Sequence, residues 1–104
     1  MIESEEMNAI LNVGVDDETT VLNAQELRLS IKKALADHRI SYEDFAERIA
    51  CRHPHTFGIM LNSTCEWAEL TAVAQLSFRR MNNWLKQPLV VRLAMLDMRV
   101  TKGK

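Results

Sequence analysis

Apolar side chains recur every three or four residues along most of this 104-residue chain, in short segments that open at helix-capping residues. The clearest segment begins at Asn23, with Glu26 three residues later as in a capping box, and ends near His38. Its buried stripe is predicted to consist of Leu27, Ile31, Ala34 and Leu35, with Arg28, Lys32 and Lys33 turned outward. Three glycines and two prolines are too few for the turns of an all-β fold. The pattern therefore predicts an all-α domain.

Four further helices are predicted in the same way, over residues 42–49, 54–61, 70–86 and 88–100. Ser41 caps the first of these, and Pro54 occupies the first position of the second. Pro88 separates the last two. Residues 62–69 are expected to form a polar link around Trp67. The predicted inward side chains are Phe45, Ala46, Ile49, Phe57, Met60, Leu61, Val73, Leu76, Phe78, Met81, Trp84, Leu85, Leu89, Leu93, Leu96 and Val100.

Charge divides the chain more clearly than its net value of −1 suggests. Residues 1–26 carry seven acidic side chains and no Lys or Arg, whereas residues 70–104 carry seven basic side chains against Asp97 alone. We expect three parts: an acidic N-terminal segment over 1–21, a helical domain over 22–100, and a disordered tail over 101–104. The acidic segment is either partly disordered or a short helix capped by Ser4, whose apolar side would dock on the domain or bind a partner.

Several classes of protein are disfavoured by what the sequence contains. It has no apolar run long enough for a membrane span and no visible signal peptide, and its two cysteines are expected to be free thiols in a reducing compartment. Without a Gly-rich phosphate loop, a nucleophile elbow or a His-Glu-x-x-His motif, an enzyme is not expected. Four residues of zinc-ligand type do not follow a common zinc spacing, so no metal or cofactor is predicted; they are Cys51, His53, His55 and Cys65.

A short helix, a tight turn and a second short helix within residues 41–62 suggest a helix-turn-helix, a geometry that many small bundles share. Three stretches make the suggestion specific. Residues 40–52 read ISYEDFAERIACR, residues 67–70 read WAEL, and residues 78–88 read FRRMNNWLKQP. Together they resemble the CUT domain of the one-cut class of cut-homeobox transcription factors, over about residues 22–100.

The resemblance implies a five-helix bundle related to the POU-specific and λ-repressor type, with its third helix in the DNA major groove. It also implies a nuclear transcription regulator. Members of the family usually continue into a homeodomain, which 104 residues do not accommodate. We therefore expect either an isolated domain or one part of a longer chain.

The third helix departs from the family pattern. Residues 53–62 read HPHTFGIMLN where the family has Ser-Gln-Gly-Thr-Leu-Ser-Asp-Leu-Leu-Arg. Pro54 replaces a glutamine that can bond adenine edges, and Ile59 replaces an aspartate. In the fourth helix, Asn82 and Asn83 stand where the family has Trp and Lys. The predicted core is thus kept while the predicted reading surface is changed.

Two functions follow from these residues. In the first, the domain binds double-stranded DNA. The side chains predicted to face base edges are His53, His55, Thr56 and Asn62. Those predicted to hold phosphates are Arg52, Arg79, Arg80 and Lys86. Four phosphate contacts would give a log–log salt slope of about −4. In the alternative, a divergent CUT domain binds a protein through its N-terminal segment or third helix, with contacts at Met7, Ile10, Leu11 and Ile59.

Overall fold

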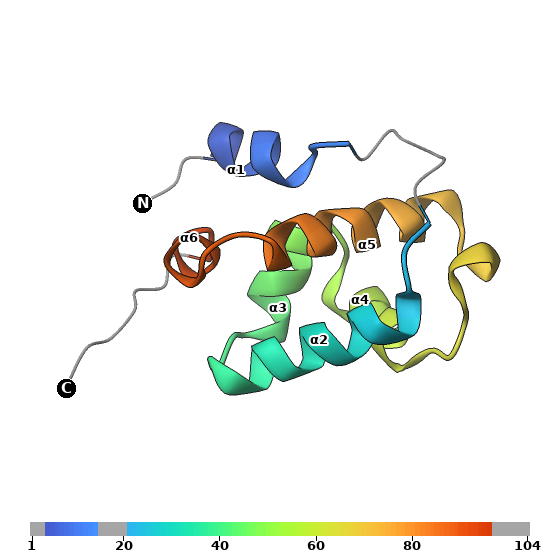
Figure 1. Ribbon diagram of the computed structural model, residues 1–104. Coiled ribbons are helices and arrows are strands. Elements are labelled where there is room, and N and C mark those ends of the chain that lie inside the picture. Colours follow the sequence, from blue (N-terminus) through green and yellow to red (C-terminus); the bar gives the residue numbers. More distant parts are fainter. Residues whose placement is uncertain (1–3, 15–20, 97–104) are drawn as a thin grey trace.

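Helix α5, Ala72–Leu85, forms the centre of the structure. The structure is a computed structural model, and it describes residues 4–14 and 21–96. Helix α1, Ser4–Leu11, lies along one side of α5, and α2, Ala24–Asp37, contacts α5 from the other side (Figure 1). The remaining elements are α3 Tyr42–Phe45, the π-helical turn η1 Ala46–Ala50, α4 Pro54–Asn62, the 3-10 turn η2 Trp67–Glu69 and α6 Leu89–Ala94. The all-α prediction is confirmed, and α2 to α6 are the five predicted helices.

The predicted capping residues account for most helix starts. Asn23 Oδ1 accepts a hydrogen bond from Glu26 N at 3.0 Å, Ser41 Oγ accepts one from Asp44 N, and Pro54 is the first residue of α4. Three predicted starts differ from the structure by one or two residues. Ser4 already lies within α1, and Pro88 is the N-cap of α6 rather than its first residue. Helix α5 begins after Thr71, whose Oγ1 accepts from Ala74 N at 3.2 Å.

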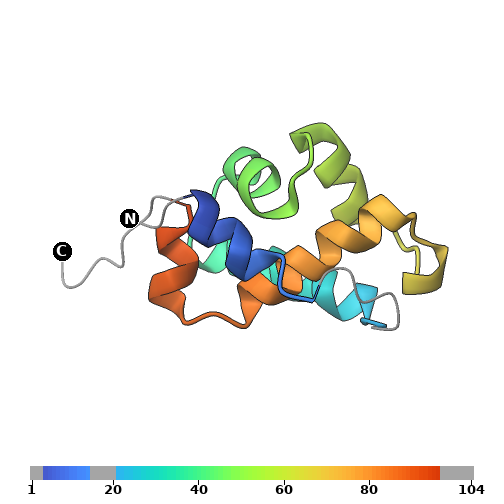
Figure 2. The same cartoon turned by 90° about the horizontal axis from the view of Figure 1, so that it is seen from above.

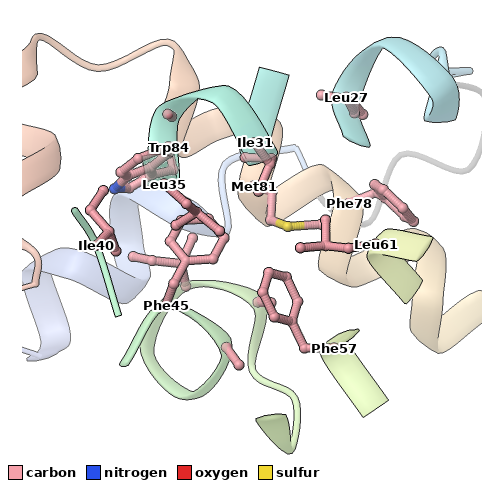
Figure 3. Close-up of a cluster of buried hydrophobic side chains, with 14 of the residues drawn as sticks. Leu27, Ile31, Leu35, Ile40, Phe45, Phe57, Leu61, Phe78, Met81 and Trp84 are labelled. Atoms are coloured by element: carbon pink, nitrogen blue, oxygen red, sulfur yellow. The ribbon is translucent and has the colours of Figure 1, made fainter. Parts of the chain in front are cut away.

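The core is a continuous cluster in which aromatic rings from three helices meet (Figure 3). Phe45 has its ring centroid 4.9 Å from that of Trp84 and 5.5 Å from that of Phe57, and all three side chains are fully buried. The Trp84 indole N–H donates to Arg92 O at 3.2 Å, so the polar atom of this ring is satisfied as well. This cluster joins α3, α4 and α5 into one unit.

Three predicted orientations are wrong. Val73 and Leu76 are exposed, because the buried stripe of α5 runs through Ala74, Ser77, Phe78, Met81 and Trp84. Arg28, which the periodicity predicts to face outward, retains only 3% of its accessible surface. Its guanidinium finds carbonyl acceptors inside the bundle, which a periodicity argument does not anticipate.

Two further predictions concern residues outside those that the structure describes: the tail over 101–104 and the inward position of Val100. Within residues 4–14 and 21–96, none of the helices has both the length and the apolar character that crossing a membrane requires.

Candidate nucleic-acid interface

The helix-turn-helix consists of α3 with η1, a short turn, and α4. The turn begins at Cys51, whose φ of 55° lies in the left-handed region, while Arg52 N donates to Ala46 O at 2.9 Å. Helix α4 then starts at Pro54, and His53 caps it because its Nδ1 accepts from His55 N at 3.2 Å. The predicted helix-turn-helix is therefore present, with a π-helical turn at the end of its first helix.

Helix α4 has one buried and one exposed side. Phe57, Met60 and Leu61 lie in the core, whereas His55, Ile59 and Asn62 are exposed. These exposed residues are four and three positions apart, so they form one stripe along the helix. An open depression along the stripe is lined by Pro54, His55, Gly58, Ile59, Asn62 and Ser63. No residue of α4 is Asp, Glu, Lys or Arg, so the stripe is polar and apolar but carries no fixed charge.

Arg28 fastens the C-terminal end of α4 to α2. Its Nε donates to Met60 O at 2.8 Å and its Nη1 donates to Cys65 O at 2.7 Å. The guanidinium carbon also lies 5.3 Å from the ring centroid of Phe78 in α5. A buried charge that satisfies carbonyls on both sides of a helix end fixes where that end lies.

Arg80 plays the same part for η1, the π-helical turn before α4. Its Nε donates to Ile49 O at 2.7 Å and its Nη2 donates to Arg48 O at 3.1 Å, while Ser77 Oγ donates to Ala50 O at 2.8 Å. Arg80 is 3% exposed. It cannot serve as the phosphate contact predicted for it, because its donors are directed into the protein.

The other predicted DNA-binding residues divide into two groups. Arg52, His53, His55, Thr56 and Asn62 lie together on α4 or in the turn before it. Arg52 is half-buried, and among the described residues its Nε has no hydrogen-bond partner.

The second group, Arg79 and Lys86, lies on α5 or at its C-terminal end. Arg79 is 9% exposed, and its guanidinium carbon stands 5.2 Å from the ring centroid of Trp67. Lys86 is exposed at the C-terminal end of α5, which points toward α6 and away from α4 in both views (Figures 1 and 2). Arg79 therefore has little exposed surface for a phosphate, and Lys86 lies at the end of α5 that points away from α4.

The N-terminal helix docks on the bundle itself. Met7 and Leu11 are buried, so neither is available as the exposed partner contact predicted for it. Ile10 is half-buried. Asn83 Nδ2 donates to Leu11 O at 2.7 Å and to Val13 O at 2.9 Å. This contact gives a structural use to an asparagine that departs from the family pattern.

Arg80 also holds the same helix. Its Nη1 donates to Asn12 Oδ1 at 2.8 Å and its Nη2 donates to Asn8 Oδ1 at 3.1 Å. One buried guanidinium therefore contacts α1 and the turn before α4.

The described residues include no group of three His, Cys, Asp or Glu side chains placed to hold a metal ion.

Comparison with known proteins identifies the family to which the sequence is related. The CUT domain family model matches residues 18–97, which leaves α1 outside the match. The chain is 36% identical to Homeobox protein ceh-38 of Caenorhabditis elegans over 96 residues, covering 92% of this chain and 15% of that protein. It is 31% identical to One cut domain family member 3 of Mus musculus over 83 residues, covering 80% of this chain and 17% of the relative. It is 30% identical to Hepatocyte nuclear factor 6 of Homo sapiens over 83 residues, covering 80% of this chain and 18% of that protein.

The chain thus spans less than a fifth of the length of each of these relatives. The family match covers α2 to α6, including the helix-turn-helix and the buried Arg28 and Arg80. On these grounds the chain belongs to the CUT domain family, whose members bind DNA.

Proposed function

We propose that this chain is a DNA-binding domain of a nuclear transcription regulator and that α4 enters the major groove of double-stranded DNA. The observation that carries the proposal is the exposed stripe of α4, a helix whose C-terminal end is bonded to Arg28 and whose preceding turn η1 is bonded to Arg80. A recognition helix reads bases through side chains near its N-terminus. The exposed His53 and His55 occupy that position here.

The polar groups around α4 match the chemistry of base edges. His53 uses Nδ1 as the cap acceptor, so in the neutral ring its proton lies on Nε2, which becomes a donor. Asn62 donates one amide hydrogen to Gly58 O at 3.0 Å and keeps its carbonyl oxygen as an acceptor. His55 and Thr56 add further donors and acceptors. Base edges in the major groove present both kinds of partner.

The phosphate grip in this proposal is weaker than a count of basic residues suggests. Of the four predicted phosphate contacts, Arg79 and Arg80 are buried, which leaves Arg52 beside α4 and the exposed Lys86, which would meet the phosphate backbone away from the α4 stripe. Two phosphate contacts correspond to a log–log salt slope of about −2, half of the original expectation. Sequence-independent affinity is therefore modest, and base contacts must carry more of the binding.

Fluorescence anisotropy with a random-sequence duplex pool at several salt concentrations tests the proposal. We expect binding that weakens with salt at a slope of about −2, and a slope about one unit shallower for Arg52→Ala. Lys33→Ala is the control, because Lys33 is exposed on α2 and paired with Asp37. Absence of binding at the lowest salt concentration contradicts the proposal.

A second candidate function is a protein-interaction module. The exposure of Ile59, at 59%, favours it, since a large aliphatic side chain in the middle of a surface stripe suits an apolar contact. Of the N-terminal residues assigned to such an interface, only the half-buried Ile10 keeps much accessible surface. If His55→Ala abolishes duplex binding and Ile10→Ala leaves it unchanged, the result favours DNA binding over the protein-interaction function.

A further inference from the structure

Ile59 is an unusual side chain for the middle of a DNA-reading stripe. It is 59% exposed and lies one turn after His55 and one turn before Asn62. Its neighbour Gly58 has no side chain, and a Cβ added there would meet nothing within 4 Å. Ile59 therefore projects beside bare backbone, where a flat ligand can come close to the helix.

The polar side chains around Ile59 do not cover it. Asn62 turns its amide back onto Gly58 O at 3.0 Å, within its own helix. His53 is turned toward the helix start, where it caps His55 N at 3.2 Å. With no charged residue on α4, the centre of the stripe is an apolar surface with polar groups at either end.

The major groove offers one apolar group that matches this surface. Its edges carry donors and acceptors, and the C5 methyl group of thymine is the exception. We infer that Ile59 packs against a pyrimidine C5 methyl group, so that the domain selects thymine at the base pair facing the middle of α4. The inference rests on the proposed function. It accounts for an aliphatic side chain where the family pattern has an aspartate.

Replacement of thymine by deoxyuridine tests the inference, because it removes only the methyl group. The preferred duplex is first selected from a random-sequence pool with the full 104-residue chain. Each thymine of that duplex is then replaced singly. We expect one replacement to weaken binding about fourfold, the factor that burial of one methyl group gives. Ile59→Ala is expected to bind the thymine and deoxyuridine duplexes equally.

Leu29→Ala is the matched control, because Leu29 is an aliphatic side chain on α2 that is 69% exposed. It must retain the fourfold preference for thymine. Both substituted positions are exposed, so both variants are expected to fold, which circular dichroism and thermal unfolding check. A preference that survives in Ile59→Ala overturns the inference, since another side chain then senses the methyl group.

A second comparison, with cytosine in place of thymine, tests whether the methyl group itself is recognised. At the sensitive position, cytosine and 5-methylcytosine are compared in otherwise identical duplexes. Tighter binding of 5-methylcytosine in the native chain, abolished by Ile59→Ala, supports contact with the methyl group itself. If the selected duplex binds but no thymine is sensitive, the inference fails while DNA binding stands. If no duplex is bound, the proposed function fails, and the inference fails with it.

Discussion

Helices α1 and α4 are both short and lie against the same bundle, but different forces hold them. The inner side of α4 is aromatic and aliphatic, with Phe57 fully buried against Phe45. The inner side of α1 provides Met7 and Leu11, and hydrogen bonds from Arg80 and Asn83 supply the rest. The position of α4 is therefore a property of the core, whereas α1 can separate with a smaller loss of stability.

Arg80 belongs to both regions. It donates to carbonyl oxygens of the turn before α4 and to side-chain oxygens of α1. Loss of α1 would leave part of this buried guanidinium without partners, and the turn before α4 would lose part of its support. Four substitutions distinguish how firmly each helix is held.

Removing the aromatic anchor of α4 is expected to have the largest effect. Phe57→Ala should lower the free energy of unfolding by about 3–5 kcal/mol, because it leaves a cavity between Phe45 and Tyr42. Chemical denaturation followed by circular dichroism measures this change. Ile59→Ala, on the exposed side of the same helix, should stay within about 0.5 kcal/mol of the native value. Equal effects of the two variants would contradict the assignment of the buried and exposed sides.

Arg80→Ala should lower the free energy of unfolding by about 2–3 kcal/mol, since it leaves buried carbonyl oxygens without a donor. Lys86→Ala, at the exposed C-cap of the same helix, should change the free energy of unfolding by less than about 0.5 kcal/mol. Hydrogen exchange should also rise at Arg52, whose amide is bonded to Ala46 O at 2.9 Å in the supported turn. If Arg80→Ala kept the native stability but bound DNA more weakly, Arg80 would be a phosphate contact after all.

Leu11→Ala should lower the free energy of unfolding by about 2 kcal/mol, the lower end of the range for a buried leucine. The effect is limited because detachment of α1 sets an upper bound on what any α1 variant can lose. Val13→Ala is the control, since Val13 is 67% exposed. Thermal and chemical unfolding of both variants provide the measurement. A loss as large as that of Phe57→Ala would show that α1 is part of the cooperative core.

Asn83→Ala should have the smallest effect, about 1 kcal/mol, because it removes the two hydrogen bonds to Leu11 O and Val13 O. Asn82→Ala is its matched control, because Asn82 is adjacent and half-buried, and no described residue bonds its side chain. Proteolysis of α1 should become faster in Asn83→Ala and stay unchanged in Asn82→Ala. Indistinguishable rates would exclude Asn83 from the docking of α1.

Sequence reasoning reached the features of this fold that depend on nearby residues. Asn23, Ser41 and Pro54 mark helix starts because caps act within a few positions. The turn and α4 were placed correctly for the same reason, so five of the predicted DNA-binding residues do lie together, namely Arg52, His53, His55, Thr56 and Asn62. Their contact with DNA stays a prediction.

The buried arginines could not be found in that way. Hydrophobic periodicity assigns every arginine to the surface, yet Arg28 and Arg80 bond carbonyl oxygens about thirty residues away. Which carbonyls lie within reach depends on how the helices pack, which the spacing of apolar residues does not specify. The FRRM stretch pointed to Arg80 through family resemblance, but its buried hydrogen bonds, rather than exposed charge, define its role here.

The contacts of α1 also bear on the order in which the chain folds. Its hydrogen bonds to α5 join residues separated by 68 and 72 positions, whereas the rings of α3 and α4 are about a dozen positions apart. Closing a long loop has a larger entropic penalty, and contacts of high sequence separation tend to form late. We expect α1 to dock after the rate-limiting step. Leu11→Ala should then accelerate unfolding and leave the refolding rate nearly unchanged.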